Sequence, residues 1–71
     1  MENFVNSHKY FLFCTGTKFK GKTTFDTRAL AEDAMKKFCM NNGIQVELTE
    51  RDKHEAKYSN HKGIRFYINR V

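Results

Sequence analysis

Residues 26–43, DTRALAEDAMKKFCMNNG, are the stretch that decides the fold, because both ends and one face of a helix can be read from them. Asp26 is a suitable N-cap, since its carboxylate can accept hydrogen bonds from the free N–H groups of the first turn. Gly43 is the residue type that ends helices in a left-handed conformation. Between them, apolar residues recur at spacings of three and four, which predicts one apolar stripe facing a core. The stripe consists of Leu30, Ala31, Ala34, Met35, Phe38 and Cys39.

The segments on either side of this helix have the pattern of strands. Residues 9–15, KYFLFCT, are rich in aromatic side chains and too few for a helix, so they predict a strand with Phe11 and Phe13 on one side. Residues 18–25 alternate and predict a second strand, joined to the first by a hairpin that turns either at 16–17 or at 20–21. Residues 44–50 and 64–71 alternate in the same way, and we expect Leu48 and Phe66 to point inward.

This order of elements predicts an α+β domain, β-β-α-β-β, with one helix packed on one face of a small antiparallel sheet. No Pro/Gly/Ser-rich linker divides the chain, so residues 1–71 are expected to form a single domain. Residues 1–7 are interpreted as a loose N-terminal lead-in. Residues 51–63 show no apolar period and predict a long polar loop, which is either functional or partly structured.

The charge of the chain is strongly basic, with a net charge of +5 and an isoelectric point near 9.4. The helical stretch is neutral, so the excess of lysine and arginine lies in the flanking segments. Such an excess attracts polyanions, and it also serves solubility alone. A chain of 71 residues has a thin core and little room for an enclosed active site, which favours binding over catalysis.

The sequence contains no arrangement that indicates an enzyme, a metal site or a cofactor. Cys14 and Cys39 fall on apolar runs and are interpreted as reduced core thiols, while His8, His54 and His61 have no zinc-ligand spacing. No run of residues is apolar enough to span a membrane, and the polar start is unlike a signal peptide. A cytoplasmic protein without a membrane partner is therefore expected.

The face of the sheet opposite the helix is the predicted functional surface. It is expected to carry aromatic side chains beside arginines, which is the composition of a protein interface core. The residues predicted to contact the partner are Phe11, Phe13, Lys18, Lys20, Lys22, Lys57, Lys62, Arg65, Tyr67 and Arg70. The favoured hypothesis is a small binding protein that docks on an acidic or nucleic-acid-handling protein. Small basic domains of this composition are typical of phage and mobile-element proteins that inhibit or modulate host machinery.

Two alternatives use the same residues. The first is direct nucleic-acid binding, with lysines on phosphates and Tyr67 or Phe13 stacking on bases. The second is a homodimer, in which the same face of two copies would cover Phe11 and Phe13.

Overall fold

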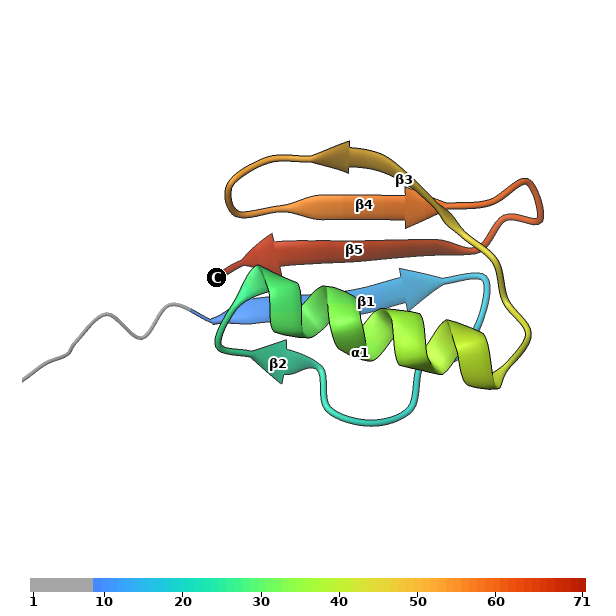
Figure 1. Cartoon of the computed structure of the whole chain (residues 1–71), viewed down its shortest axis with the longest axis horizontal. Helices are drawn as coiled ribbons and strands as arrows, with labels where there is room; N and C mark the ends of the chain where they lie inside the picture. The colour runs from blue at the N-terminus through green and yellow to red at the C-terminus, as the bar shows by residue number, and fades with distance from the viewer. Residues whose placement is uncertain (1–8) are drawn as a thin grey trace, which may run out of the picture.

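The computed structural model describes residues 9–71, so the predicted lead-in at residues 1–7 lies outside the described residues, as does His8. A single helix and a five-stranded antiparallel sheet make up this part of the chain (Figure 1). In order, the elements are β1 (Tyr10–Thr15), β2 (Thr24–Phe25), α1 (Arg28–Asn41), β3 (Glu47–Arg51), β4 (Ala56–Ser59) and β5 (Arg65–Arg70). The predicted α+β class, one helix on one face of a small antiparallel sheet, is confirmed. Three strands follow the helix instead of two, because β4 lies in the segment predicted as a loop.

The strands lie in the order β2-β1-β5-β4-β3, so the first and last strands of the chain pair at the centre of the sheet. In this central pair Leu12 lies opposite Ile68 and Phe13 lies opposite Tyr67. The helix packs against β5, β1 and β2 and lies beside β3 and β4 rather than over them (Figure 1). One face of the sheet is therefore half covered by α1, and no described element covers the other face.

The core between α1 and the sheet is small, and its largest fully buried side chains are Phe66, Leu12, Met35 and Ile68. These residues come from the alternating positions of β1 and β5 and from the predicted stripe of α1, which confirms the two periodicities. Leu30 departs from the prediction, since 51% of this side chain is exposed at the start of the helix. Among the described residues, no helix is long and apolar enough to cross a membrane.

Both ends of α1 are fixed by local hydrogen bonds, but its first cap differs from the predicted one. Thr27, not Asp26, is the N-cap, and its hydroxyl accepts a 3.1 Å hydrogen bond from the backbone N–H of Leu30. Asp26 instead forms an ion pair with Lys9. At the other end Gly43 has φ of +66°, and the N–H of Ile44 donates to the carbonyl of Cys39 at 2.9 Å, which is the predicted left-handed ending.

The segment predicted as a long polar loop contains β4, so its partly structured interpretation is the correct one. Ala56 and Tyr58 are buried and alternate with Lys57 and Ser59, a period of two that is too short to stand out among polar neighbours. Asp52 closes the turn before β4. Its carboxylate accepts hydrogen bonds from the backbone N–H groups of His54 and Glu55. These bonds hold the pKa of Asp52 below its ordinary value.

Strand β3 differs from its prediction because it contains a β-bulge. The register shifts between Leu48 and Glu50, so that Leu48 lies opposite Tyr58 and Arg51 lies opposite Ala56. The extra residue turns the Arg51 side chain toward α1. Leu48 is also on this side, but it remains 44% exposed because the helix does not reach the edge strand.

The second predicted strand is also shorter than expected. Only Thr24 and Phe25 pair with β1, and residues 16–23 form a long connection instead of a tight hairpin. Within this connection Phe19 packs on Phe38 of α1, with their ring centroids 5.0 Å apart. The connection is therefore attached to the helix, and the lysines on either side of Phe19 are exposed.

Candidate functional site: an aromatic sheet face and a basic end

Three aromatic side chains form a continuous patch at the centre of the uncovered sheet face, and we call this patch the aromatic face. Phe11 and Phe13 of β1 are 39% and 38% exposed, and their ring centroids are 5.6 Å apart. Phe13 stacks on Tyr67 of β5, with ring centroids 5.0 Å apart and an angle of 22° between the planes. The patch results from strand alternation, because the register places Phe13 directly opposite Tyr67.

The charged side chains around the aromatic face are balanced. On adjacent strands, Lys57 lies opposite Tyr67 and Glu50 lies opposite Lys57. Lys57 Nζ is 3.1 Å from the Glu50 carboxylate. This hydrogen bond and the Glu50 charge raise the pKa of Lys57. In the next row Arg65 and Glu47 both lie opposite Ser59 on its two sides. Two basic and two acidic residues thus share this face.

The structure brings half of the predicted contact residues to this face and places the others elsewhere. Phe11, Phe13, Lys57, Arg65 and Tyr67 lie on it, as alternation predicts. Arg70 does not belong there, because residues 65, 67 and 69 share one side of β5 and Arg70 has the opposite parity.

Arg70 instead belongs to a small cluster at the C-terminal end of β5, on the side of the sheet that faces α1. Its guanidinium lies 3.2 Å from His54 Nε2, and the Tyr10 hydroxyl lies 3.1 Å from His54 Nδ1. The prediction that Arg70 shares a surface with Tyr67 is therefore wrong.

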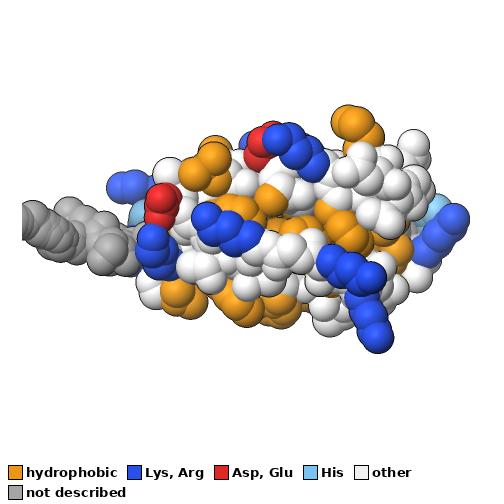
Figure 2. Space-filling view, turned by 90° about the horizontal axis from the view of Figure 1, so that it is seen from below, with side chains coloured by type: hydrophobic (Ala, Val, Ile, Leu, Met, Phe, Trp, Pro, Cys, Tyr) orange, Lys and Arg blue, Asp and Glu red, His pale blue; other side chains and the backbone are white. Residues whose placement is uncertain are grey.

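The remaining predicted lysines lie in connections between strands. Lys18, Lys20 and Lys22 belong to the residue 16–23 connection, and Lys62 belongs to the turn between β4 and β5. Lys22 Nζ lies 5.5 Å from the centroid of the Phe25 ring at the β2 edge. Figure 2 views the molecule from this edge and shows Lys and Arg side chains spread along it, with little acidic surface.

Two of these connections meet at one end of the sheet, and we call this surface the basic end. Gly16 and Gly63 are in direct backbone contact, since a Cβ at Gly16 would lie 2.5 Å from the Gly63 carbonyl oxygen. Lys18 follows Gly16 by two residues, Lys62 directly precedes Gly63, and Arg65 follows it by two. Figure 2 shows basic side chains and a histidine gathered at the end opposite the grey trace.

A buried carboxylate of α1, which is not part of the predicted apolar stripe, connects the helix to the other half of the sheet. Glu32 is 6% exposed and receives Arg51 Nη2 at 2.8 Å, Arg28 Nε at 3.3 Å and the Tyr58 hydroxyl. Burial raises the pKa of Glu32, but the hydrogen bonds from Tyr58 and Arg51 and the charges of Arg51 and Arg28 outweigh it, so the pKa lies below its ordinary value. The bulge in β3 turns Arg51 toward Glu32 and so allows this contact. No periodic pattern in the sequence indicates the bulge, so the contact could not be predicted.

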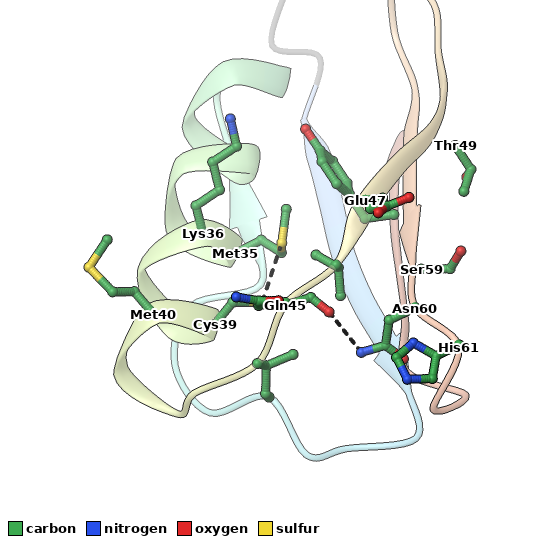
Figure 3. Close-up of a pocket in the computed structure, with 13 residues that line it drawn as sticks. Met35, Lys36, Cys39, Met40, Gln45, Glu47, Thr49, Ser59, Asn60 and His61 are labelled. Atoms are coloured by element: carbon green, nitrogen blue, oxygen red, sulfur yellow. Dashed lines mark hydrogen bonds between the residues drawn. The ribbon is translucent and has the colours of Figure 1, made fainter.

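A groove of about 710 Å³ lies between the second half of α1 and strands β3 and β4 (Figure 3). Met35 and Cys39 point from the helix into it, and Met40, Thr49 and Ser59 also belong to its lining. At its lower end the Asn60 side chain donates to the carbonyl of residue 45 at 2.8 Å. The groove is mostly apolar and follows from the incomplete cover that α1 gives to the sheet.

The cysteines and histidines do not form a reactive cluster among the described residues. Both Cys14 and Cys39 are free thiols, as predicted, and burial, with a smaller contribution from Cys14, raises the pKa of the Cys39 thiol. A raised pKa lowers the fraction of thiolate, the nucleophilic form. Within residues 9–71, no group of three or more His, Cys, Asp or Glu side chains could hold a metal ion.

Comparison with known proteins gives no relative, since no family model, no curated protein and no solved structure matches the chain.

Proposed function

We propose that this chain is a non-enzymatic binding protein that docks its aromatic face on a protein partner and acts by occupying the partner's surface. The observation that carries the proposal is the contiguous patch of Phe11, Phe13 and Tyr67 on the uncovered side of the sheet. Exposed apolar patches of this kind are characteristic of interaction sites.

The surroundings of the patch match the anatomy of a protein interface. Interface centres are enriched in aromatic residues and arginine, and their rims are polar. Here the centre is the stacked pair Phe13 and Tyr67, and the rim includes Arg65, Lys57 and Glu50. Because Lys57 is already neutralised by Glu50, Arg65 is the cation of this face that remains available to a partner's carboxylate. The partner surface is therefore expected to be apolar at its centre and acidic opposite Arg65.

The balanced charge of the aromatic face favours protein over nucleic acid at this surface. Nucleic-acid binding draws much of its affinity from the neutralisation of several phosphates. The two glutamates on the β3 side of the face would oppose such contacts. A protein partner of mixed charge meets no such penalty.

The test compares complexes formed by the wild type and by the Phe13→Ala/Tyr67→Ala double variant. Met40→Ala is the matched control, because Met40 is 79% exposed on α1, on the other side of the sheet from the aromatic face. The probe is a purified host protein whose contact surface is apolar and acidic. We expect the wild type and Met40→Ala to form the same one-to-one complex with this protein. The double variant should not form the complex. The proposal fails if the double variant, shown to be folded by circular dichroism, keeps the complex.

Homodimerisation through the same face is separated by sedimentation of the protein alone. A concentration-dependent dimer that the double variant abolishes would replace the proposed partner by a second copy. A constant monomer mass leaves the face open to a different protein.

Nucleic acid remains the second candidate ligand of the aromatic face, because Arg65 lies on this face and also next to the basic end. In that case Tyr67→Ala would weaken nucleic-acid binding by about 1–3 kcal/mol, the usual effect of a lost stacking ring. If the aromatic face binds protein, Tyr67→Ala abolishes one specific complex and leaves polyanion binding nearly unchanged.

A further inference from the structure

The contact between Gly16 and Gly63 joins two connections that are 47 positions apart in the sequence and that each carry basic residues. A Cβ at Gly16 would meet backbone atoms of Gly63 and Ile64 at 2.5–3.0 Å, so the two segments touch through their main chains. This close approach brings the backbone positions of Lys18, Lys62 and Arg65 to the same end of the sheet. Lys20 extends the same cluster along the β2 edge.

The cationic groups of the basic end are exposed, and within residues 9–71 none of them forms an ion pair. The acidic side chains are engaged elsewhere: Asp26 with Lys9, Asp33 with Lys37 and Glu50 with Lys57. Six of the seven acidic residues in this part of the chain lie in segments 26–33 and 50–55, and Glu47, at the start of β3, is the seventh. Charge is thus segregated along the molecule.

The backbone under these lysines is held in place by specific contacts. The Asn60 carboxamide accepts hydrogen bonds from the N–H groups of Lys62 and Ile64 at 2.9 and 3.1 Å, which fixes the turn between β4 and β5. On the other connection, the Cys14 thiol donates to the carbonyl of Thr17 at 3.2 Å, and Phe19 is anchored on Phe38. The positions of the charges are therefore set before a ligand binds, which reduces the entropy lost on binding.

The composition of the basic end identifies the kind of ligand. The large exposed apolar residues of the described chain are outside the segments 16–20 and 60–65 that form this end. Ile64 and Phe19 are partly buried against the core. A surface of lysine, arginine, glycine and asparagine without an apolar centre lacks what a stable protein interface requires. It matches the sugar–phosphate backbone, which is bound mainly through charge and release of counterions.

We propose that the basic end binds the phosphate backbone of nucleic acid without reading its sequence, through Lys18, Lys20, Lys62 and Arg65. This surface adjoins the aromatic face at Arg65, and the inference goes beyond the proposed function: the chain would dock on a protein through Phe11, Phe13 and Tyr67 and contact nucleic acid through the neighbouring basic residues. A nucleic-acid-handling partner presents both features together.

The experiment measures binding of a labelled 20-nucleotide single strand and of the matching duplex by anisotropy over a series of salt concentrations. We expect a dissociation constant of about 1–100 µM at physiological salt and a linear fall of log affinity with log salt. Lys18→Ala/Lys62→Ala should lower the affinity about 10- to 30-fold and reduce the salt slope by roughly 1.4–1.8, the contribution of two phosphate contacts.

The matched control is Lys37→Ala/Lys53→Ala, which removes the same net charge from the helix surface and from the β3–β4 turn. It should change the affinity by less than about 3-fold and leave the slope of log affinity against log salt unchanged. Equal losses in the two double variants would overturn the proposal, because attraction would then depend on net charge alone. No binding at 100 µM protein in about 50 mM salt would overturn it as well.

Two further measurements distinguish this proposal from protein binding at the basic end and from nucleic-acid binding at the aromatic face. Polyglutamate that competes as strongly as nucleic acid would identify an acidic protein as the ligand and refute the proposal. Phe13→Ala/Tyr67→Ala should leave nucleic-acid affinity unchanged. If that variant loses nucleic-acid binding, the strand lies across the aromatic face and the proposed protein-docking function fails, whereas loss of the protein complex alone leaves both assignments intact.

Discussion

Arg51 of β3 and Glu32 of α1 form an ion pair, with Arg51 Nη2 2.8 Å from Glu32 Oε2 and Arg51 Nε 3.1 Å from the same oxygen. The helix packs its apolar stripe on β5, β1 and β2. This polar contact, together with Tyr58 and the hydrogen bond from Arg28 to the carbonyl of Asp52, links it to β3, β4 and the turn between them. The arrangement replaces a second layer of apolar packing over that half of the sheet.

We expect Glu32→Ala to lower the free energy of unfolding by about 2–3 kcal/mol, because it leaves the Tyr58 hydroxyl and Arg51 without their acceptor. Tyr58→Phe removes one hydrogen bond and should cost about 1 kcal/mol. Urea unfolding followed by circular dichroism measures both. Asp33→Ala, which removes only an exposed pair with Lys37 at 3.7 Å, is the control and should change stability by less than about 0.5 kcal/mol. An equal effect of Glu32→Ala and Asp33→Ala would contradict the role given to Glu32.

Stability should also depend on pH through Glu32. Its pKa is lower in the folded chain than its ordinary value of 4.5, so the ionised carboxylate is favoured by folding. The stabilisation is present above pH 4.5 and is lost as the pH falls through the folded pKa. The exposed Asp26 and Asp52 have lowered pKa values and act in the same direction. Glu32→Gln should therefore flatten, but not abolish, the acid limb in unfolding curves taken at a series of pH values; an unchanged limb would refute this assignment.

The N-terminal cap of α1 gives a third prediction. Thr27→Ala removes the acceptor of the Leu30 N–H and should destabilise the protein by about 0.5–2 kcal/mol. Asp26→Ala removes only an exposed ion pair and should have a smaller effect. Thermal unfolding of the two variants decides between the caps, and a larger loss for Asp26→Ala would restore Asp26 as the cap.

Alanine at two glycines should separate backbone strain from steric contact. Gly16 and Gly43 have φ of +85° and +66°, but a Cβ would meet the Gly63 carbonyl only at Gly16. We expect Gly43→Ala to cost about 1–2 kcal/mol, the usual penalty of a left-handed residue with a side chain. Gly16→Ala should cost more than this, since the two connections would have to separate. Urea midpoints measure the order, and the reverse order would contradict the contact.

Alternation along the strands was sufficient to predict which side chains of β1 and β5 lie on the aromatic face, but it does not give the strand order, so the central pairing of these two strands was not predicted. The positions of Phe13 and Tyr67 follow from a period of two, which depends only on local geometry. The same rule excludes Arg70 from that face, so its inclusion was an error in applying the rule and not a limit of the sequence. The helix could be read with equal success because its apolar stripe and its glycine ending are local signals.

The remaining features depend on how far elements reach in space. Leu48 has the correct parity to be buried, yet its exposure is decided by the width of the sheet relative to one helix. Arg51 meets Glu32 because a bulge shifts the register, and a bulge adds one residue without a sequence period. The basic end is formed by two segments that are distant in sequence, so its charges appear there only once Gly16 and Gly63 are in contact.

The two outermost strands have a consequence for behaviour at high concentration. Strand β2 has two residues, and β3 is interrupted by a bulge and carries Glu47, Glu50 and Arg51. A sheet recruits further strands through long, flat edges with unpaired backbone groups, whereas short, kinked and charged edges resist this. This chain is therefore protected from lateral polymerisation into fibres, and association should proceed through the broad surfaces of the sheet instead of its borders.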